Sequence, residues 1–184
     1  LPKSFFLGAA ASAWQTEGWM GKKEGQDSQM DSWYKNEPHI WYDGYGPAVA
    51  TNFIERYKED IAYMKEIGIQ IYRTSINWAR FLTDYENAVV DEEYAAYFSD
   101  MLDTCIENGV EPMEHYELPT YLLDKYNGWS SRHVVDLFVK YALKAFERFG
   151  DRVKYWFAFN EPIVIQTRSY LDAVRWPHHQ DSAM

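Results

Sequence analysis

The stretch KYWFAFNEP at residues 154–162 is strongly aromatic, yet it ends on an amide, a carboxylate and a proline. Burying the polar side chains of Asn160 and Glu161 is costly unless they bind something. Hydrogen-bonding groups at the tip of an apolar strand can recognise a ligand with several hydroxyl groups. The stretch therefore indicates a buried strand with a functional pair at its carboxyl end.

Polar side chains also end three other apolar segments. They are Gln15 and Glu17 after the first segment, Arg73, Ser75 and Asn77 in the second, and Glu114, His115 and Glu117 in the third. Aromatic residues lie among them: Trp14, Trp78, Tyr116 and Trp156. Amides, carboxylates, an imidazole and a guanidinium beside aromatic faces suit a polyol, because the rings can cover the C–H side of a sugar.

Each polar residue also has a structural interpretation. Gln15 and Glu17 could cap a turn, and His115 could be a hydrogen-bonded core histidine. Arg73 could serve only a structural ion pair, since a buried guanidinium needs a carboxylate partner. Convergence of all these residues at one end of a sheet favours the functional interpretation. The adjacent His178 and His179 lack a third ligand at metal-type spacing, so we expect a surface loop and no metal or cofactor.

The elements that must position these residues alternate regularly. Apolar residues at helical spacing predict helices over residues 52–67, 91–108 and 131–149, the first opened by a capping box of Asn52 and Glu55. Glycines 68, 109 and 150, spaced 41 residues apart, are predicted to end them in left-handed conformation. Short apolar strands are predicted over residues 5–11, 69–76, 110–117 and 153–160.

Strands that alternate with helices imply parallel βαβ units. Neither a GxGxxG nor a GxxxxGK[ST] phosphate loop occurs, which disfavours a doubly wound nucleotide-binding fold. We therefore predict an α/β fold, a (β/α)₈ TIM barrel. Such barrels usually need about 250 residues. Residues 1–184 are accordingly expected to be the N-terminal part of a single barrel domain, roughly its first four strands.

Composition excludes several classes of partner. The net charge is −10 and no run of Lys and Arg occurs, so we expect no nucleic acid. No apolar run is long enough to span a membrane, and no signal-type segment is present, so we expect no membrane association. Cys105 is the single cysteine and lies on an apolar helical face, which favours a core position and a reducing, cytoplasmic location.

Three stretches together, FFLGAAASAWQTEG, YRTSINWAR and GDRVKYWFAFNEP, resemble glycoside hydrolase family 1. The resemblance covers the whole chain and implies a retaining β-glycosidase on a (β/α)₈ barrel. The Thr74-Ser75-Ile76 variant and the lead-in GYGPAVATNFIERYKEDI look most like the branch that acts on 6-phospho-β-glycosides. A phosphorylated β-glucoside is therefore the expected substrate, with an unphosphorylated β-glucoside or β-galactoside as the alternative.

The resemblance also implies roles for individual residues. Glu161 matches the general acid/base, and Asn160 the amide that binds the sugar 2-hydroxyl. Gln15 and His115 match residues that bind other glycone hydroxyls, and Arg73 matches the cation that keeps the nucleophile ionised. Tyr116 stands where the family pattern has Trp, in HYELP, and is kept as a sugar contact.

The second carboxylate that a retaining glycosidase needs is not apparent. In the family the nucleophile lies in a T/I-E-N-G stretch late in the barrel, and no such stretch occurs in these 184 residues. We therefore expect the nucleophile and the phosphate-binding residues to lie outside this sequence, and the 184 residues alone to be inactive. A non-catalytic half-barrel that only binds sugar or self-associates is the further alternative, because two open sheet edges favour homo-oligomers.

Overall fold

The computed structural model describes residues 2, 4–116 and 118–178, and for residues 113–116 and 166 it describes the backbone only. Its main sheet has four parallel strands, β1 (Gly8–Ala10), β2 (Ile71–Ile76), β5 (Glu111–Tyr116) and β6 (Tyr155–Trp156). They lie side by side in chain order, β1-β2-β5-β6. A doubly wound sheet reverses its strand order partway. The uninterrupted order is the one expected for the first half of a barrel.

Three long helices connect the strands: α3 (Phe53–Glu66), α5 (Glu92–Glu107) and α7 (Arg132–Phe149). All three were predicted to within two residues from the spacing of their apolar side chains. The face of α5 predicted to be apolar is buried throughout, including Cys105. Asp91 caps α5, since its side chain accepts hydrogen bonds from the backbone N–H groups of Glu93 and Tyr94.

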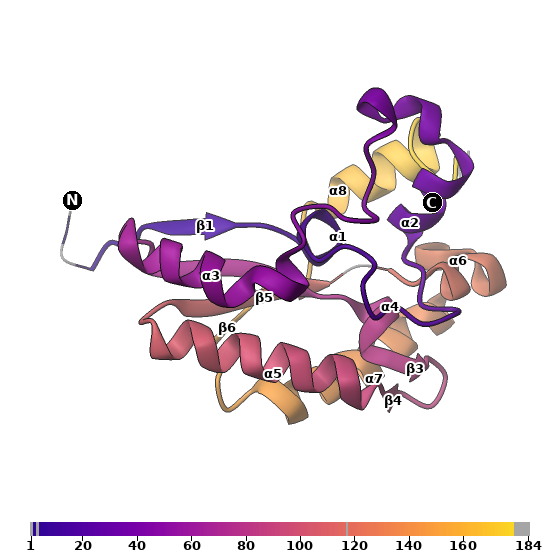
Figure 1. Ribbon diagram of the computed structural model, residues 1–184. Coiled ribbons are helices and arrows are strands. Elements are labelled where there is room, and N and C mark those ends of the chain that lie inside the picture. The colour runs from indigo at the N-terminus through magenta and orange to yellow at the C-terminus, as the bar shows by residue number, and fades with distance from the viewer. Residues whose placement is uncertain (1, 3, 117, 179–184) are drawn as a thin grey trace.

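Shorter elements fill the connections. The helices are α1 (Ala13–Thr16), α2 (Gln29–Asn36), α4 (Trp78–Phe81), α6 (Thr120–Tyr126) and α8 (Pro162–Ile165). Single turns are η1 (Pro38–Ile40), η2 (Tyr42–Gly44), η3 (Gly128–Ser130) and the π-helical η4 (Gln166–Leu171). A hairpin pairs β3 (Leu82–Asp84) with β4 (Val89–Val90). In Figure 1, β1 points toward α1, and α2 and α8 lie together beyond that end of the sheet.

Aromatic contacts pack the helices onto one side of the sheet. The ring of Phe53 on α3 lies 5.7 Å from that of Tyr72 on β2, and the ring of Phe146 on α7 lies 4.7 Å from that of Trp156 on β6. Successive side chains of a strand face opposite sides. Because Tyr72 faces the helices, Arg73 faces the other side, which is the interior of the predicted barrel.

Three local predictions were wrong. Asn52 is left-handed (φ 55°) and its amide donates to the Glu55 side chain at 2.5 Å, so the extended N-cap and the backbone bonds of a capping box are absent. Gly68 and Gly109 do have positive φ, but Gly150 has φ −67° and its N–H still bonds within the helix. Strand β6 covers two residues because the chain leaves β5 after Trp156.

None of the helices in the described part of the chain is both long and apolar enough to cross a bilayer.

Candidate active site

A cavity of about 620 Å³ lies beyond the carboxyl ends of β1 and β2. Its size is typical of small-molecule sites. Four of the residues predicted for the site line it: Gln15, Arg73, Asn160 and Glu161. They come from α1, from β2 and from the segment between β6 and α8, so parallel strands bring together side chains up to 146 residues apart (161 − 15).

Arg73 and Asn160 contact each other in the cavity wall. The Arg73 guanidinium donates from Nη2 to Asn160 Oδ1 at 2.6 Å, and it lies 5.4 Å from the centre of the Phe157 ring. Arg73 Nε is buried without a hydrogen-bond partner among the described residues. Among the described residues Arg73 therefore bonds an amide and has no carboxylate partner.

Glu161 is held in an unusual backbone conformation. Its φ is 47°, in the left-handed region that non-glycine residues rarely adopt, and its carbonyl accepts from the Val164 N–H at 2.9 Å as α8 begins. Its side chain is exposed, and it is the single carboxylate among the described residues that line the cavity. Backbone strain of this kind concentrates at functional sites because the surrounding structure must enforce it.

Gln15 enters the cavity wall on the single turn of α1, together with Trp14. Glu17, which sequence reasoning placed at the same rim, is not among the cavity-lining residues. It is 3% exposed and accepts a hydrogen bond from Tyr94 at 2.8 Å. Burial raises the pKa of its carboxyl group, against the opposing effect of the nearby Arg80. The position of Glu17 in the sequence did not reveal that its side chain is buried away from the cavity.

For His115 and Tyr116 the structure describes the position of the backbone only. In the ladder of β2 and β5, His115 pairs with Ser75 and Tyr116 with Ile76, at the same carboxyl ends. Their side chains and that of Glu114 lie outside the described part of the structure, as does residue Glu117. Their proposed sugar contacts stay predictions.

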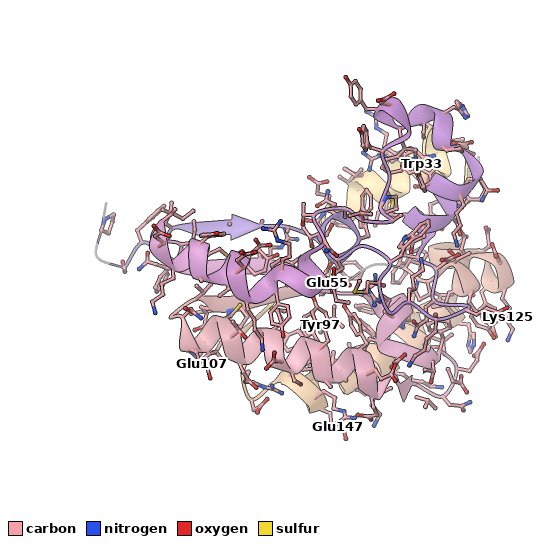
Figure 2. The ribbon with its side chains drawn as sticks, in the orientation of Figure 1. Trp33, Glu55, Tyr97, Glu107, Lys125 and Glu147 are labelled. Atoms are coloured by element: carbon pink, nitrogen blue, oxygen red, sulfur yellow. The ribbon has the colours of Figure 1, made fainter. Side chains whose placement is uncertain are left out.

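Sequence reasoning missed most of the aromatic wall. Besides Trp14, four tryptophans line the cavity: Trp33, Trp41, Trp129 and Trp176. The Trp41 ring makes edge contacts with Trp14 and Trp33, with centroid distances of 5.6 and 5.8 Å. Figure 2 places Trp33 on α2, in the part of the molecule beyond the strand ends. The count of 8 Trp hinted at such a surface, but positions far from the strands gave no reason to choose these four.

Two contacts join the segments that flank the cavity. Glu37, just after α2, accepts from Trp33 Nε1 at 2.8 Å and lies 3.0 Å from His178 Nε2. The Gln29 amide donates to the Trp176 carbonyl at 3.3 Å. No group of His, Cys, Asp or Glu in the described ranges has the arrangement of a metal site. His178 contacts Glu37, and residue 179 is outside the described ranges.

Comparison with known proteins matches the whole chain, residues 1–184, to the sequence pattern of glycosyl hydrolase family 1. The chain is 38% identical over 183 residues to the 6-phospho-beta-glucosidase GmuD of Bacillus subtilis, covering 98% of this chain and 39% of that protein. It is 39% identical over 166 residues to beta-glucosidase 42 of Arabidopsis thaliana, covering 88% and 34%. The chain thus spans well under half of the length of these relatives.

Solved structures agree with the fold. An aphid myrosinase superimposes with a TM-score of 0.89 at 31% identity, covering 97% of this chain and 39% of that chain. A beta-glucosidase from Thermotoga maritima, in complex with a substituted glucoimidazole, gives 0.89 at 31% identity, covering 98% and 41%. These neighbours are (β/α)₈ barrel enzymes, which confirms the predicted fold class. By sequence and by structure, the chain belongs to glycosyl hydrolase family 1.

Proposed function

We propose that these residues form the first part of the catalytic domain of a retaining β-glycosidase that acts on 6-phospho-β-glucosides in the cytoplasm. One observation carries the proposal: Gln15, Arg73, Asn160 and Glu161 line one cavity at the carboxyl ends of parallel strands. In a barrel this face is where catalytic groups from different strands meet.

In the proposed mechanism Glu161 acts as general acid and then as general base. It protonates the departing glycosidic oxygen while a second carboxylate attacks the anomeric carbon and forms a glycosyl-enzyme ester. Glu161 then removes a proton from the water that cleaves the ester. Retaining enzymes hold the two carboxyl groups about 5–5.5 Å apart. No T/I-E-N-G stretch, the family pattern for the nucleophile, occurs in this sequence, so we propose that the nucleophile lies on a segment outside these 184 residues.

The remaining residues bind and orient. Gln15, His115 and Tyr116 are proposed to contact the sugar, and Asn160 to bind its 2-hydroxyl. Arg73 holds Asn160 through Nη2, and its guanidinium, which lines the cavity, is proposed to lie beside the carboxylate nucleophile. A guanidinium beside a carboxylate lowers the pKa of that carboxyl group, so the nucleophile would stay ionised for its attack.

Two observations favour a phosphorylated substrate. The Bacillus relative is named a 6-phospho-beta-glucosidase. The cavity lining also contains two guanidinium groups, Arg73 and Arg175, against one carboxylate, although the whole chain carries a net charge of −10. With Arg73 assigned to the nucleophile, Arg175 is the guanidinium left for an anionic ligand. The names of the plant relatives support the alternative, an unphosphorylated β-glucoside.

The deciding experiment compares p-nitrophenyl β-glucoside with its 6-phosphate in the full-length protein. Faster turnover of the phosphorylated substrate is expected. Faster turnover of the unphosphorylated one would establish the alternative. A protein that cleaves neither this pair nor the corresponding galactosides would contradict the proposed glycosidase activity altogether.

The 184 residues alone are proposed to bind sugar without turning it over. Strands β1 and β6 each have a single neighbour in the described sheet, so both present an edge that can pair with another chain. Self-association of this segment is therefore expected. A monodisperse monomer in analytical ultracentrifugation would contradict that expectation.

A further inference from the structure

A buried ion pair lies beneath the turn that carries Gln15. Arg80 Nη1 on α4 is 3.4 Å from Glu17 Oε2, and each side chain is only 4% exposed. Removing two charges from water is expensive, and their attraction compensates only when further hydrogen bonds satisfy both groups. A buried ion pair therefore adds little net stability, and its contacts with the neighbouring backbone suggest a different role.

The Arg80 guanidinium holds the backbone that follows α1. Nη2 donates to the Met20 carbonyl at 2.6 Å, and Nη1 donates to the Gly18 carbonyl at 3.4 Å. Tyr94 supports the pair from α5: its hydroxyl donates to Glu17 Oε1 at 2.8 Å, and its ring lies 5.1 Å from the guanidinium carbon. One side chain therefore contacts the chain at residues 17, 18 and 20.

The other end of α1 is fixed by the neighbouring strand. The Ala13 N–H donates to Ser75 Oγ of β2 at 2.6 Å. A helix of four residues has too few internal hydrogen bonds to persist without tertiary contacts. Both anchors, Ser75 and Arg80, belong to the chain segment that begins with Arg73. The turn between the anchors presents Trp14 and Gln15 to the cavity.

We infer that the Glu17–Arg80 pair is a positioning device that sets Trp14 and Gln15 against the Arg73 side of the cavity. The pair touches no cavity surface itself, so neither residue is catalytic. The link to sugar binding rests on the proposed function, whereas the link to the conformation of α1 does not. A purely structural pair would stabilise the whole fold without a selective effect on α1.

The first test needs no activity. The full-length protein is labelled with ¹⁵N, and the indole N–H signal of Trp14 is compared between the wild type and the double variant Glu17→Gln/Arg80→Met. Removing both charges avoids leaving one of them buried alone. The matched control is Arg56→Met/Glu59→Gln, an exposed pair on α3 with the same substitutions. Assignment uses Trp14→Phe, and Trp156 serves as the internal reference.

In the double variant the Trp14 signal should shift or broaden, and the backbone amide at position 17 should exchange its hydrogen faster. The control variant should change neither the signal nor the exchange rate. An unaltered Trp14 signal with unaltered exchange would overturn the inference. If the double variant does not fold, Arg80→Lys replaces it. Lysine keeps the charge, but its single ammonium group cannot contact Glu17, Gly18 and Met20 together. The Trp14 signal should therefore shift in this variant as well. An unchanged Trp14 signal with unchanged hydrogen exchange would overturn the inference.

The second test measures coupling in the full-length protein. Glu17→Gln/Arg80→Met should lower kcat/KM about tenfold alone and have almost no effect when Gln15→Ala is already present, because the lost interaction is the same one. Equal effects in both backgrounds would contradict positioning through Gln15. If the unmutated protein shows no turnover, the proposed function is contradicted. The Trp14 signal would still test whether the Glu17–Arg80 pair positions α1.

Discussion

The Arg73 guanidinium donates to the Oδ1 atom of Asn160 at 2.6 Å, although the two residues are 87 positions apart in the chain. An amide whose oxygen is occupied in this way turns its Nδ2 donor in a defined direction. Arg73 therefore orients the amide that we propose binds the sugar 2-hydroxyl.

The first prediction concerns this contact. Arg73→Met should reduce kcat/KM by about 10- to 100-fold, as expected for losing a charged hydrogen bond worth about 1.5–3 kcal/mol. The loss should be smaller for a 2-deoxyglucoside, since that substrate offers Asn160 no hydroxyl. Parallel assays of both substrates provide the comparison. Equal losses on both would show that Arg73 does not act through Asn160.

The second prediction concerns backbone strain at Glu161. A left-handed conformation costs a non-glycine residue about 1–2 kcal/mol, and glycine avoids it but loses roughly 0.5–1 kcal/mol of backbone entropy. With φ at 47°, Glu161→Gly should leave the free energy of unfolding unchanged or raise it slightly. Glu161→Ala, which keeps the Cβ atom, is the control. Denaturant titration that found the glycine variant less stable than the alanine variant would refute the strain argument.

The third prediction concerns Glu86, in the turn of the β3–β4 hairpin. Its carboxylate accepts from Tyr126 and from Lys125 (3.0 Å), and lies 3.1 Å from the His133 ring. The Tyr126 hydrogen bond contributes most to lowering the Glu86 pKa to about 2. A depressed pKa stabilises the fold above the unfolded value near 4.5, and this contribution disappears as pH falls toward 2.

Glu86→Gln should therefore destabilise the chain by a constant amount above about pH 5, with the difference shrinking between pH 4.5 and 2. Urea titrations across this range measure it. Glu107→Gln, at an exposed position on α5 (Figure 2), is the control and should show no such trend. A Glu86→Gln effect that stayed constant down to pH 2 would contradict the assignment.

The fourth prediction concerns His178. Its hydrogen bond to the Ala173 carbonyl and its contact with Glu37 raise the pKa of the imidazole above 6.5. A raised pKa stabilises the fold below 6.5, and the contribution is lost as pH rises through the folded value. His178→Ala should remove this pH dependence, and Glu37→Gln should reduce it because the Ala173 carbonyl remains, at a cost of about 1 kcal/mol or less for a partly exposed pair. Thermal unfolding at pH 5.5 and 8.5 tests this, and a wild-type pH response in either variant would argue against the contact.

Much of the fold could be predicted because helix and strand periodicity is local. The apolar faces of α3, α5 and α7 repeat at helical spacing, and the strands between them are short apolar runs. The ends of the helices were harder to predict. Asn52 has the residue type of an N-cap, but its left-handed backbone, which no local pattern revealed, prevents the capping box.

The site was predictable where side chains lie on an apolar strand or shortly after one, as with Arg73 and Asn160. It was not predictable where loops fold back over the strand ends. Trp41 and Trp176 reach the cavity through turns far apart in the chain, and no periodicity marks them. The prediction that Glu17 lies at the cavity rim was wrong. Glu17 follows an apolar strand, as the site residues do, but its side chain turns into the core and pairs with Arg80.

The most direct test of the proposed mechanism is azide rescue of Glu161→Gly in the full-length protein. Without its acid/base, the enzyme should still form the glycosyl-enzyme from a dinitrophenyl β-glycoside, whose leaving group needs no protonation, but should cleave a natural disaccharide very slowly. Azide needs no general base and should restore turnover, yielding the β-glycosyl azide. A variant that hydrolyses the disaccharide at the wild-type rate, or that does not respond to azide, would show that Glu161 is not the acid/base.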